Sequence, residues 1–330
     1  MEAFQRLERE FAAFNGLDPA GMVACSSGTS ALHLAFEAMR LPAGSEVLVP
    51  DYNMVACPRA VTLAGLVPAF VDCDERLLMS MRHAGEAYRE NETRAVLFVH
   101  IYGRRYDVNR FAWAAVNHVE PPGIAIVEDL AEAHGVKPHL QTDAAAWSFY
   151  RNKIIAGEEG GAVWFRDPAH AALARELRTL GFTAAHDYTH TPRGHNYRLS
   201  NAHADLILDS LHRYSQNLAE RRRLEAAYDR HCQAEWRMPP RQAPWVYDLR
   251  IPGMARPQQI EVVRTLQAAG FSARFGFWPM SRQEEYQGCR VVGNGNAVRL
   301  ASEVVYLPLT PGQVTEDGCQ RAMEIIARIA

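Results

Sequence analysis

Short apolar runs and segments with helical spacing alternate through the first two thirds of the chain. The runs that predict strands are Met22–Cys25, Glu46–Pro50, Val67–Val71, Ala95–Val99, Ile124–Val127, Ala144–Phe149 and Ala162–Phe165. Residues 31–41 and 55–64 instead carry apolar side chains at the spacing of an amphipathic helix. Continuous apolar strands that alternate with helices predict an α/β fold, a mostly parallel sheet with helices on both faces.

The pattern changes after about Leu211. A long charged helix is predicted from 213 to 236, followed by a proline-rich connection, a strand at 245–251, a helix at 257–271 and a closing helix. This order is typical of a smaller α+β unit. We therefore expect a large domain at 1–215 and a small C-terminal domain at 216–330.

Composition and charge exclude several classes of protein. The 330 residues carry a net charge of −3 and 22% charged side chains, without the basic excess of a nucleic-acid-binding protein. No uninterrupted apolar stretch reaches the roughly 18 residues of a membrane span. The amphipathic N-terminal segment lacks the features of a signal peptide, so we expect a cytoplasmic protein.

Neither the cysteines nor the histidines form a recognisable metal or disulfide pattern. The six cysteines include no CxxC pair, which favours free and mostly buried thiols. His186, His190 and His195 cluster in a segment that Pro192 and Gly194 mark as a loop, without the helical spacing of a metal site. We therefore expect no metal.

A first candidate for chemistry is the segment Ser27, Gly28, Thr29 and Ser30, between a strand and a helix. Free N–H groups at a helix N-terminus bind anions, and glycine permits close approach. An ordinary serine N-cap is the alternative. The segment matches neither a Rossmann fingerprint nor a P-loop.

Two further candidates follow predicted strands. Asp129 ends an apolar strand, at the sheet edge where open α/β sheets bind ligands, although it could simply cap the next helix. Lys153 lies between a strand end and a glycine-rich turn. It becomes a nucleophile if burial lowers its pKa, but most lysines are solvated surface residues.

Together the three features are more specific than any one alone. A phosphate-binding helix start, an acidic residue at a strand end and then a lysine form the order found in fold type I enzymes that use pyridoxal 5′-phosphate (PLP). In such an enzyme the acidic group keeps the pyridine nitrogen protonated, and the lysine holds the cofactor as a Schiff base.

Ordered motifs along most of the chain resemble one family, the DegT/DnrJ/EryC1/StrS aminotransferases, the sugar aminotransferase branch of fold type I. The segments that carry the resemblance are SSGTSALHLAF, GSEVLVPDYNMVACPRAVTLAGLVPAFVDCD, AVLFVHIYGRRYDV, IAIVEDLAEAHG, WSFYRNKIIAGEEGGAVWF, GHNYRLSNAHADL and VVYLPLTPG. The resemblance implies PLP as cofactor and a homodimer whose active sites are shared between subunits.

The resemblance also implies roles for individual residues. Lys153 would be the Schiff-base lysine and proton-transfer base, and Asp129 the partner of the pyridine nitrogen. Glu132 would lie near the phenolic oxygen of the cofactor. Further positions would bind its phosphate: Ser27, Gly28, Thr29, Ser30 and Ser148 in the same chain, and Asn196 reaching the cofactor of the neighbouring subunit. His134 would pack beside the site.

Departures from the family pattern lie on the substrate side. Met54 stands where an aromatic ring usually stacks on the cofactor, and Tyr52 is an alternative for that contact. We expect the usual N-terminal glycine- and threonine-rich segment to be absent. Candidates for binding substrate phosphates or carboxylates are His186, Tyr188, Arg193 and Arg274.

The expected function is transfer of an amino group from an amino acid, often glutamate in this family, to a keto group of a nucleotide-linked sugar. One rival keeps PLP but uses a non-sugar acceptor or decarboxylates an amino acid. A rival of another class is a regulator that binds PLP without turnover. A dehydratase of the same family is disfavoured because those relatives replace the lysine with histidine.

Overall fold

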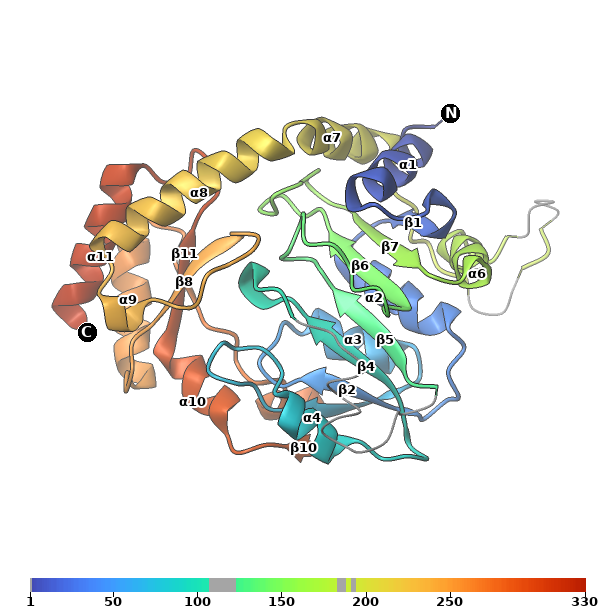
Figure 1. The fold of residues 1–330 in the computed structure, drawn as a ribbon, viewed down its shortest axis with the longest axis horizontal. Helices are drawn as coiled ribbons and strands as arrows, with labels where there is room; N and C mark the ends of the chain where they lie inside the picture. The colour runs from blue at the N-terminus through green and yellow to red at the C-terminus, as the bar shows by residue number, and fades with distance from the viewer. Residues whose placement is uncertain (1, 107–122, 183–187, 191–193) are drawn as a thin grey trace.

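Two sheets and the helices around them make up the fold of the computed structural model, which describes residues 2–106, 123–182, 188–190 and 194–330 (Figure 1). The eight-stranded sheet has the order β1-β7-β6-β5-β4-β2-β3-β10. Its strands are β1 Met22–Cys25, β2 Glu46–Pro50, β3 Val67–Val71, β4 Thr93–Val99, β5 Ala125–Asp129, β6 Ala144–Ser148, β7 Gly161–Phe165 and β10 Val291–Val292.

Strand direction in this sheet places the ends of distant segments together. β2, β3, β4, β5, β6 and β10 pair in parallel, whereas β7 pairs antiparallel with both β1 and β6. β1 therefore runs in the same direction as β6. As a result the carboxyl ends of β1, β5 and β6 meet at one edge of the sheet, where the candidate residues lie.

Helices cover both faces of the large sheet because alternate strand residues point to opposite sides. Val23 and Cys25 of β1 join one apolar cluster, with α2 Gly28–Ala38 and α3 Ala56–Leu63. Met22 and Ala24 join the other, with α1 Ala3–Asn15 and α7 Asn201–His212. The remaining helices that pack near this sheet are α4 Met81–Ala87, α6 Pro168–Arg178 and α10 Asn296–Glu303.

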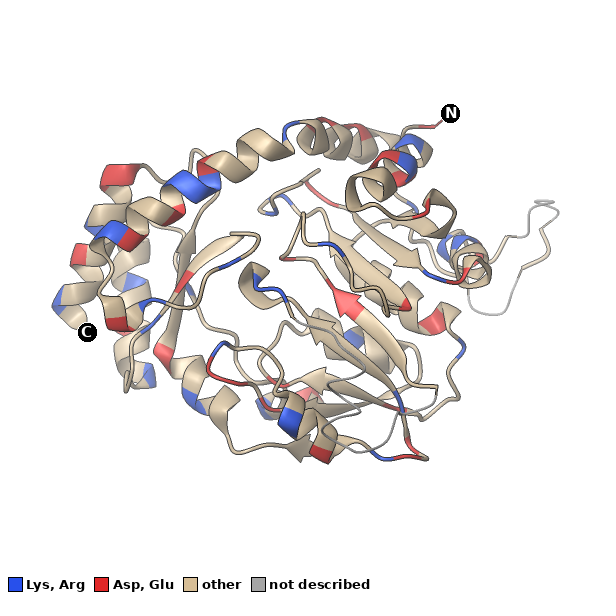
Figure 2. Ribbon diagram, in the orientation of Figure 1, with Lys and Arg blue, Asp and Glu red and all other residues tan. Residues whose placement is uncertain are grey.

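A three-stranded antiparallel sheet forms the centre of the C-terminal part. Its order is β8-β11-β9, with β8 Val246–Arg250, β9 Arg274–Phe275 and β11 Val304–Pro308. A third apolar cluster joins it to α8 Tyr214–His231, α9 Arg256–Ala268 and α11 Glu316–Ile329. Charged residues of both signs are spread along α8 and α11 (Figure 2), which is typical of helices with one solvent-facing side.

The predicted fold class is confirmed: the sheet is mostly parallel, helices lie on both of its faces and a smaller α+β part follows. The domain boundary at residue 215 stays a prediction, and β10 from the C-terminal part pairs with β3 of the large sheet. One helix starts earlier than predicted. α2 begins at Gly28 because Ser27 and Ser30 form a capping box, so SSGTS is already its first turn.

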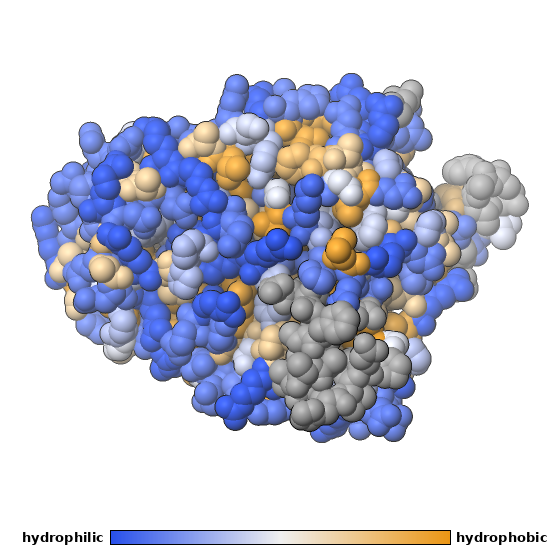
Figure 3. All heavy atoms as spheres, in the orientation of Figure 1, coloured by the Kyte–Doolittle hydropathy of each residue, from blue (hydrophilic) through white to orange (hydrophobic). Residues whose placement is uncertain are grey.

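The surface and the cysteines agree with a globular chain. In Figure 3 the rims of the visible face are mostly hydrophilic, and apolar side chains gather toward its middle. All six cysteines are free and five of them are buried, as predicted. No helix in the described part of the chain has both the length and the apolar character needed to cross a membrane.

A buried ion network links the two parts of the fold. Arg104, which follows β4, donates to both carboxylate oxygens of Asp248 on β8, at 2.9 and 2.8 Å. Arg241 donates to the same carboxylate at 2.8 Å and to Glu225 of α8 at 3.0 Å. Asp248 is fully buried, so its charge has no solvent to replace these partners.

Replacing Asp248 by alanine should lower the free energy of unfolding by about 3–5 kcal/mol, because two buried guanidinium groups lose their carboxylate. Urea unfolding of the purified protein measures this change. The control is Glu86→Ala, which removes an exposed partner of Arg82 and should cost about 1 kcal/mol or less. Equal effects of the two substitutions would contradict the role assigned to the network.

Candidate active site

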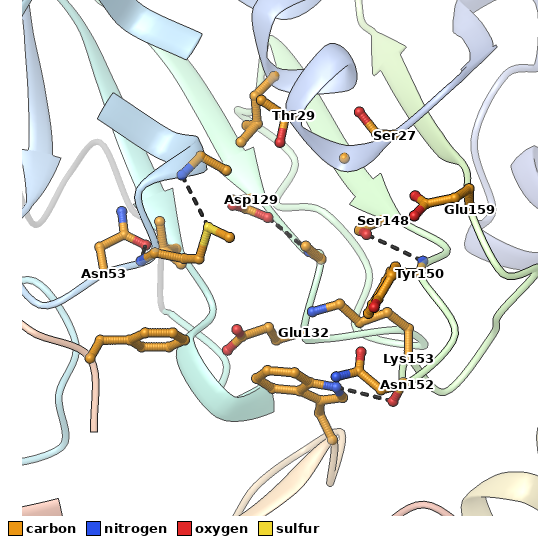
Figure 4. A pocket seen from close by; sticks show the side chains of 18 of the residues that line it. Ser27, Thr29, Asn53, Asp129, Glu132, Ser148, Tyr150, Asn152, Lys153 and Glu159 are labelled. Atoms are coloured by element: carbon orange, nitrogen blue, oxygen red, sulfur yellow. Dashed lines mark hydrogen bonds between the residues drawn. The ribbon is translucent and has the colours of Figure 1, made fainter. Parts of the chain in front are cut away.

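A cavity of about 400 Å³ opens at the carboxyl edge of the large sheet. Its polar lining includes residues from the ends of β1, β5 and β6 and from the turn after β6, namely Ser27, Thr29, Asp129, Glu132, Ser148, Asn152 and Lys153 (Figure 4). The acidic tip of β5 is visible in Figure 2. The size and the few converging polar groups are those of a small-molecule site.

The N-terminus of α2 forms one end of this cavity. Ser27 accepts the N–H of Ser30 at 3.1 Å, and the Ser30 hydroxyl accepts the N–H of Ser27 at 2.9 Å. The N–H groups of Gly28 and Thr29 have no partner among the described residues. They are therefore available to an anion, while Ser30 is committed to the cap and does not line the cavity.

Close packing between α2 and β6 explains the glycine of this loop. A Cβ atom at Gly28 would lie 2.7 Å from the Cβ of Ser148. Glycine at this position therefore lets the N-terminus of α2 approach the end of β6, with the Ser148 hydroxyl beside the free N–H groups. The arrangement fits a phosphate, with both N–H and hydroxyl donors at one end of the cavity.

Asp129 is buried in the wall of the cavity, with a defined partner for each oxygen. One oxygen accepts the Cys57 thiol at 3.0 Å and the other accepts the N–H of Ala131 at 2.8 Å. No helix follows β5, so the alternative prediction of a helix cap is wrong: Asp129 instead caps a turn, and it lines the cavity. Both carboxylate oxygens of Asp129 therefore act as hydrogen-bond acceptors at the cavity wall.

The Lys153 side chain points into the cavity toward Asp129 and Glu132 (Figure 4). Its Nζ lies 3.8 Å from the centre of the Trp245 ring, a cation–π contact. Burial lowers the pKa of the Lys153 ammonium, and the carboxylates of Glu132 and Asp129 act in the opposite direction. Lys153 is one of two lysines in the chain, and the other, Lys137, is exposed.

Glu132 shares the electrostatic environment of the lysine. Burial raises the pKa of Glu132 to about 7, while the charge of Lys153 acts to lower it. One Glu132 oxygen accepts the N–H of Tyr102 at 2.7 Å, which fixes the carboxylate beside the cavity. The Glu132 carboxyl and the Lys153 amine therefore influence each other's pKa, because each lies in a buried site next to the opposite charge.

Two buried side chains hold the turn that carries Lys153. Arg221 of α8 donates to the carbonyls of Asn152 and Lys153 at 3.1 and 3.2 Å. His134 accepts the N–H of Ile155 at 3.0 Å, and burial lowers the pKa of its ring to about 3, which keeps it neutral. His134 thus packs beside the site as predicted, through a contact to the backbone.

The mouth of the cavity holds one of the two predicted stacking candidates. Met54 is 47% exposed and lines the cavity. Tyr52 is buried outside the lining, where its hydroxyl bonds that of Tyr102 at 3.0 Å and accepts the N–H of Phe277 at 3.1 Å. Tyr52 therefore has a packing position, and Met54 lines the cavity, where its contact with the cofactor stays a prediction.

Arg274 lines a second recess of about 220 Å³ that continues from the first. The two hollows share Tyr150, Asn152, Trp245 and Tyr306, and the second adds hydroxyl, amide and guanidinium groups from Ser272, Thr310, Gln313, Arg151 and Arg274. This recess has the donors that a hydroxylated or anionic substrate would need.

The other predicted substrate and phosphate residues lie apart from the cavity or outside the described residues. Asn196 is exposed and pairs with Thr179 in an isolated β-bridge. Tyr188 is 77% exposed and its ring contacts Phe182. His186 and Arg193 belong to segments that the structure does not describe.

Sequence reasoning missed several residues that shape the site. Trp245, Phe277 and Tyr306 line the cavity, although they come from the C-terminal part of the chain. Cys57 and Arg221 act on Asp129 and on the Lys153 turn. Cys57, Arg221 and Tyr306 lie within helices or a strand, whereas Trp245 and Phe277 lie in loops, so no common local signal marks these residues.

These groups fit PLP. The free N–H groups and the Ser148 hydroxyl suit its phosphate, the buried Asp129 carboxylate suits its ring nitrogen, and the buried Lys153 amine suits its aldehyde. All of these groups lie around one cavity.

Comparisons with known proteins agree with this geometry. The model of the DegT/DnrJ/EryC1/StrS aminotransferase family matches residues 2–327. GDP-perosamine synthase of Caulobacter vibrioides is 32% identical over 84% of this chain and 77% of its own. L-glutamine:2-deoxy-scyllo-inosose aminotransferase of Streptomyces lividus is 34% identical over 68% of this chain, but only 55% of its own length is aligned.

A solved structure supports the fold along nearly the whole chain. The aminotransferase TlmJ from Streptoalloteichus hindustanus superimposes with a TM-score of 0.85 and 25% identity, covering 99% of this chain and 90% of that one.

Replacing Glu132 by glutamine should make Lys153 more reactive in the cofactor-free protein. Without the carboxylate that raises it, the pKa of Lys153 falls further and more of the amine is neutral at pH 8. Reductive methylation followed by peptide mass spectrometry should show several-fold faster labelling of Lys153.

The control for this experiment is Glu159→Gln, which removes an exposed carboxylate at the cavity wall. Lys137 serves as an internal reference in both variants. Unchanged labelling of Lys153 in Glu132→Gln would show that the carboxylate does not act on the amine.

Proposed function

The chain belongs to the DegT/DnrJ/EryC1/StrS aminotransferase family, and on that premise we propose that it transfers an amino group from an amino acid to the keto group of a nucleotide-linked sugar. The predicted family is confirmed by this membership, and PLP is its cofactor. The observation that carries the proposal is the buried amine of Lys153, which faces two carboxylates in a cavity that ends at free helix N–H groups.

The proposed roles follow from the positions of the side chains. The N–H groups of Gly28 and Thr29 and the hydroxyl of Ser148 would bind the phosphate of PLP. Asp129 would accept the N–H of the ring nitrogen, because Cys57 and Ala131 hold its carboxylate at the cavity wall. When bound, PLP supplies an electron sink for the carbon from which the donor loses its proton.

Lys153 is the proposed base that moves this proton. Burial favours the neutral amine of Lys153, which is the form that accepts a proton. The charge of the Glu132 carboxylate stabilises the ammonium that results. Trp245 also stabilises the cation through its ring face. The hydrogen bonds from Arg221 to the carbonyls of Asn152 and Lys153 keep the amine in place as its charge changes.

The acceptor is proposed from the relatives and from the second recess. The Caulobacter relative is named for a GDP-linked sugar and the Streptomyces relative for a cyclitol ketone. Arg274 would bind an anionic group of a nucleotide-linked sugar, since a guanidinium is a good partner for phosphate. A cyclitol ketone is the second candidate acceptor. The chain is about as similar in sequence to the Streptomyces relative as to the Caulobacter relative, although the alignment with the Streptomyces relative is shorter.

We also propose a cytoplasmic homodimer, with Asn196 reaching the cofactor phosphate of the neighbouring subunit. Its exposed position in a short bridged segment leaves the side chain available for such a contact. The free thiols favour a reducing compartment. Light scattering of the purified protein gives the oligomeric state directly.

Replacing Lys153 by alanine should slow the reaction of the PLP-loaded protein with glutamate by at least about 10³-fold, because the base and the attachment point are both lost. Single-turnover spectroscopy follows conversion of the cofactor to pyridoxamine phosphate. The matched control, Lys137→Ala, should react as the wild type does. A wild-type protein that reacts with neither glutamate nor glutamine would contradict the aminotransferase proposal.

Replacing Arg274 by alanine should raise the KM for a nucleotide-linked keto sugar by roughly 10- to 100-fold, the value of a lost charge-assisted hydrogen bond. The rate of the reaction with the amino donor should not change. Arg264→Ala, at an exposed position of α9, is the control. If KM stays constant for nucleotide sugars but the enzyme accepts a free cyclitol ketone, the second candidate function replaces the first.

A further inference from the structure

A second polar cluster lies outside the cavity, between α2 and the segment after α6. His33 and Glu37 are four residues apart on α2, so they share one face of the helix, and His195 approaches them from a distant part of the chain. One ligand atom from each of the three residues lies within 4.8 Å of the other two. Sequence reasoning grouped His195 with His186 and His190 instead, and therefore expected no metal.

The distances within this cluster suit a divalent ion. Nε2 of His195 lies 2.7 Å from Oε2 of Glu37, and Nε2 of His33 lies 3.7 Å from the same oxygen. Ligand atoms held 2.0–2.1 Å from a tetrahedral ion are about 3.3 Å apart, which lies between these two values. Small side-chain adjustments would therefore bring all three to one ion.

An unpartnered buried nitrogen points to a ligand at this place. Nε2 of His33 is buried without a hydrogen-bond partner, although the side chain is only 3% exposed. Its other nitrogen, Nδ1, lies 3.0 Å from the hydroxyl of Tyr197. If Nδ1–H donates to that hydroxyl, Nε2 presents its lone pair to the cluster, the usual arrangement for a metal-bound histidine.

The charges and the access also suit a metal. The His33 imidazole is buried, and the Glu37 carboxylate, which is also largely buried, adds an anionic oxygen ligand beside it. The His195 side chain is 27% exposed, so water can reach the cluster on that side and fill a fourth position. Two imidazoles, one carboxylate and a water form a known type of zinc coordination.

We propose that His33, Glu37 and His195 bind a divalent transition-metal ion, with Zn²⁺ the best match to this donor set. The ion would join α2, whose N-terminus faces the cavity, to the segment that carries Asn196. The ordinary alternative is a hydrogen-bonded pair of Glu37 and His195 without metal. The proposal does not depend on the proposed function, because its test measures metal binding alone.

The test uses the PLP-loaded protein after chelation and dialysis. Zn²⁺ is added, unbound ion is removed by gel filtration, and the bound ion is counted by mass spectrometry of the metal. We expect one Zn²⁺ per chain in the wild type. In competition with a chromophoric chelator, His195→Gln should bind Zn²⁺ at least about 100-fold more weakly than the wild type. Loss of a residue that only hydrogen-bonds to a metal ligand lowers metal affinity by about 10- to 100-fold, and loss of the ligand itself should lower it more.

Two further variants keep the test decisive. Tyr197→Phe, which leaves all three ligands in place, should weaken binding about 10-fold by releasing the orientation of His33. His212→Gln removes an exposed histidine of α7 outside the cluster and should bind as the wild type does. A wild type that retains no Zn²⁺, or a His195→Gln variant that binds as tightly as the wild type, would overturn the proposal.

Discussion

The site depends on keeping one amine out of bulk water and still reactive. Desolvation favours the neutral amine of Lys153, whereas an ion pair with a carboxylate favours the protonated ammonium. The structure sets these effects against each other: burial lowers the pKa, two carboxylates raise it, and an aromatic ring stabilises the cation without accepting the proton. The lysine is thereby left able to change its charge.

This balance requires elements from the whole chain. The carboxylates come from the end of β5 and the turn after it, the amine from the turn after β6, and Trp245 and Arg221 from the C-terminal part. The buried network of Arg104, Asp248 and Arg241 holds that part against the large sheet. Packing of the two parts is thus a condition of the chemistry, since Trp245 faces Lys153 only when they are together.

The sequence predicted the part of the site that strand ends determine. Asp129 and Ser148 end strands, Ser27 and Lys153 come shortly after strands, and parallel strands bring such positions to one edge. The strand bounds agree with the structure within two residues, because buried parallel strands are continuous apolar runs. Helix bounds were displaced further: α2 starts earlier because its first turn is built from polar capping residues, and α8 ends at His231, before the predicted end at 236.

The remaining part could not be predicted because it depends on distant residues. Cys57 looks like any small buried residue of α3 until it meets Asp129, and Tyr52 looks available until its hydroxyl meets Tyr102. His195 has two nearer histidines in sequence, yet its partners in space are His33 and Glu37. Such pairings are set by tertiary packing, which local periodicity does not record.

The most direct measurement of the central claim is the covalent position of the cofactor. Borohydride reduction of the PLP-loaded protein, followed by digestion and mass spectrometry, places a phosphopyridoxyl group on a single lysine. Because the chain has two lysines, the modified residue can be only Lys153 or Lys137. The account predicts the modification on Lys153 and none on Lys137; modification of Lys137 alone, or of neither lysine, would contradict it.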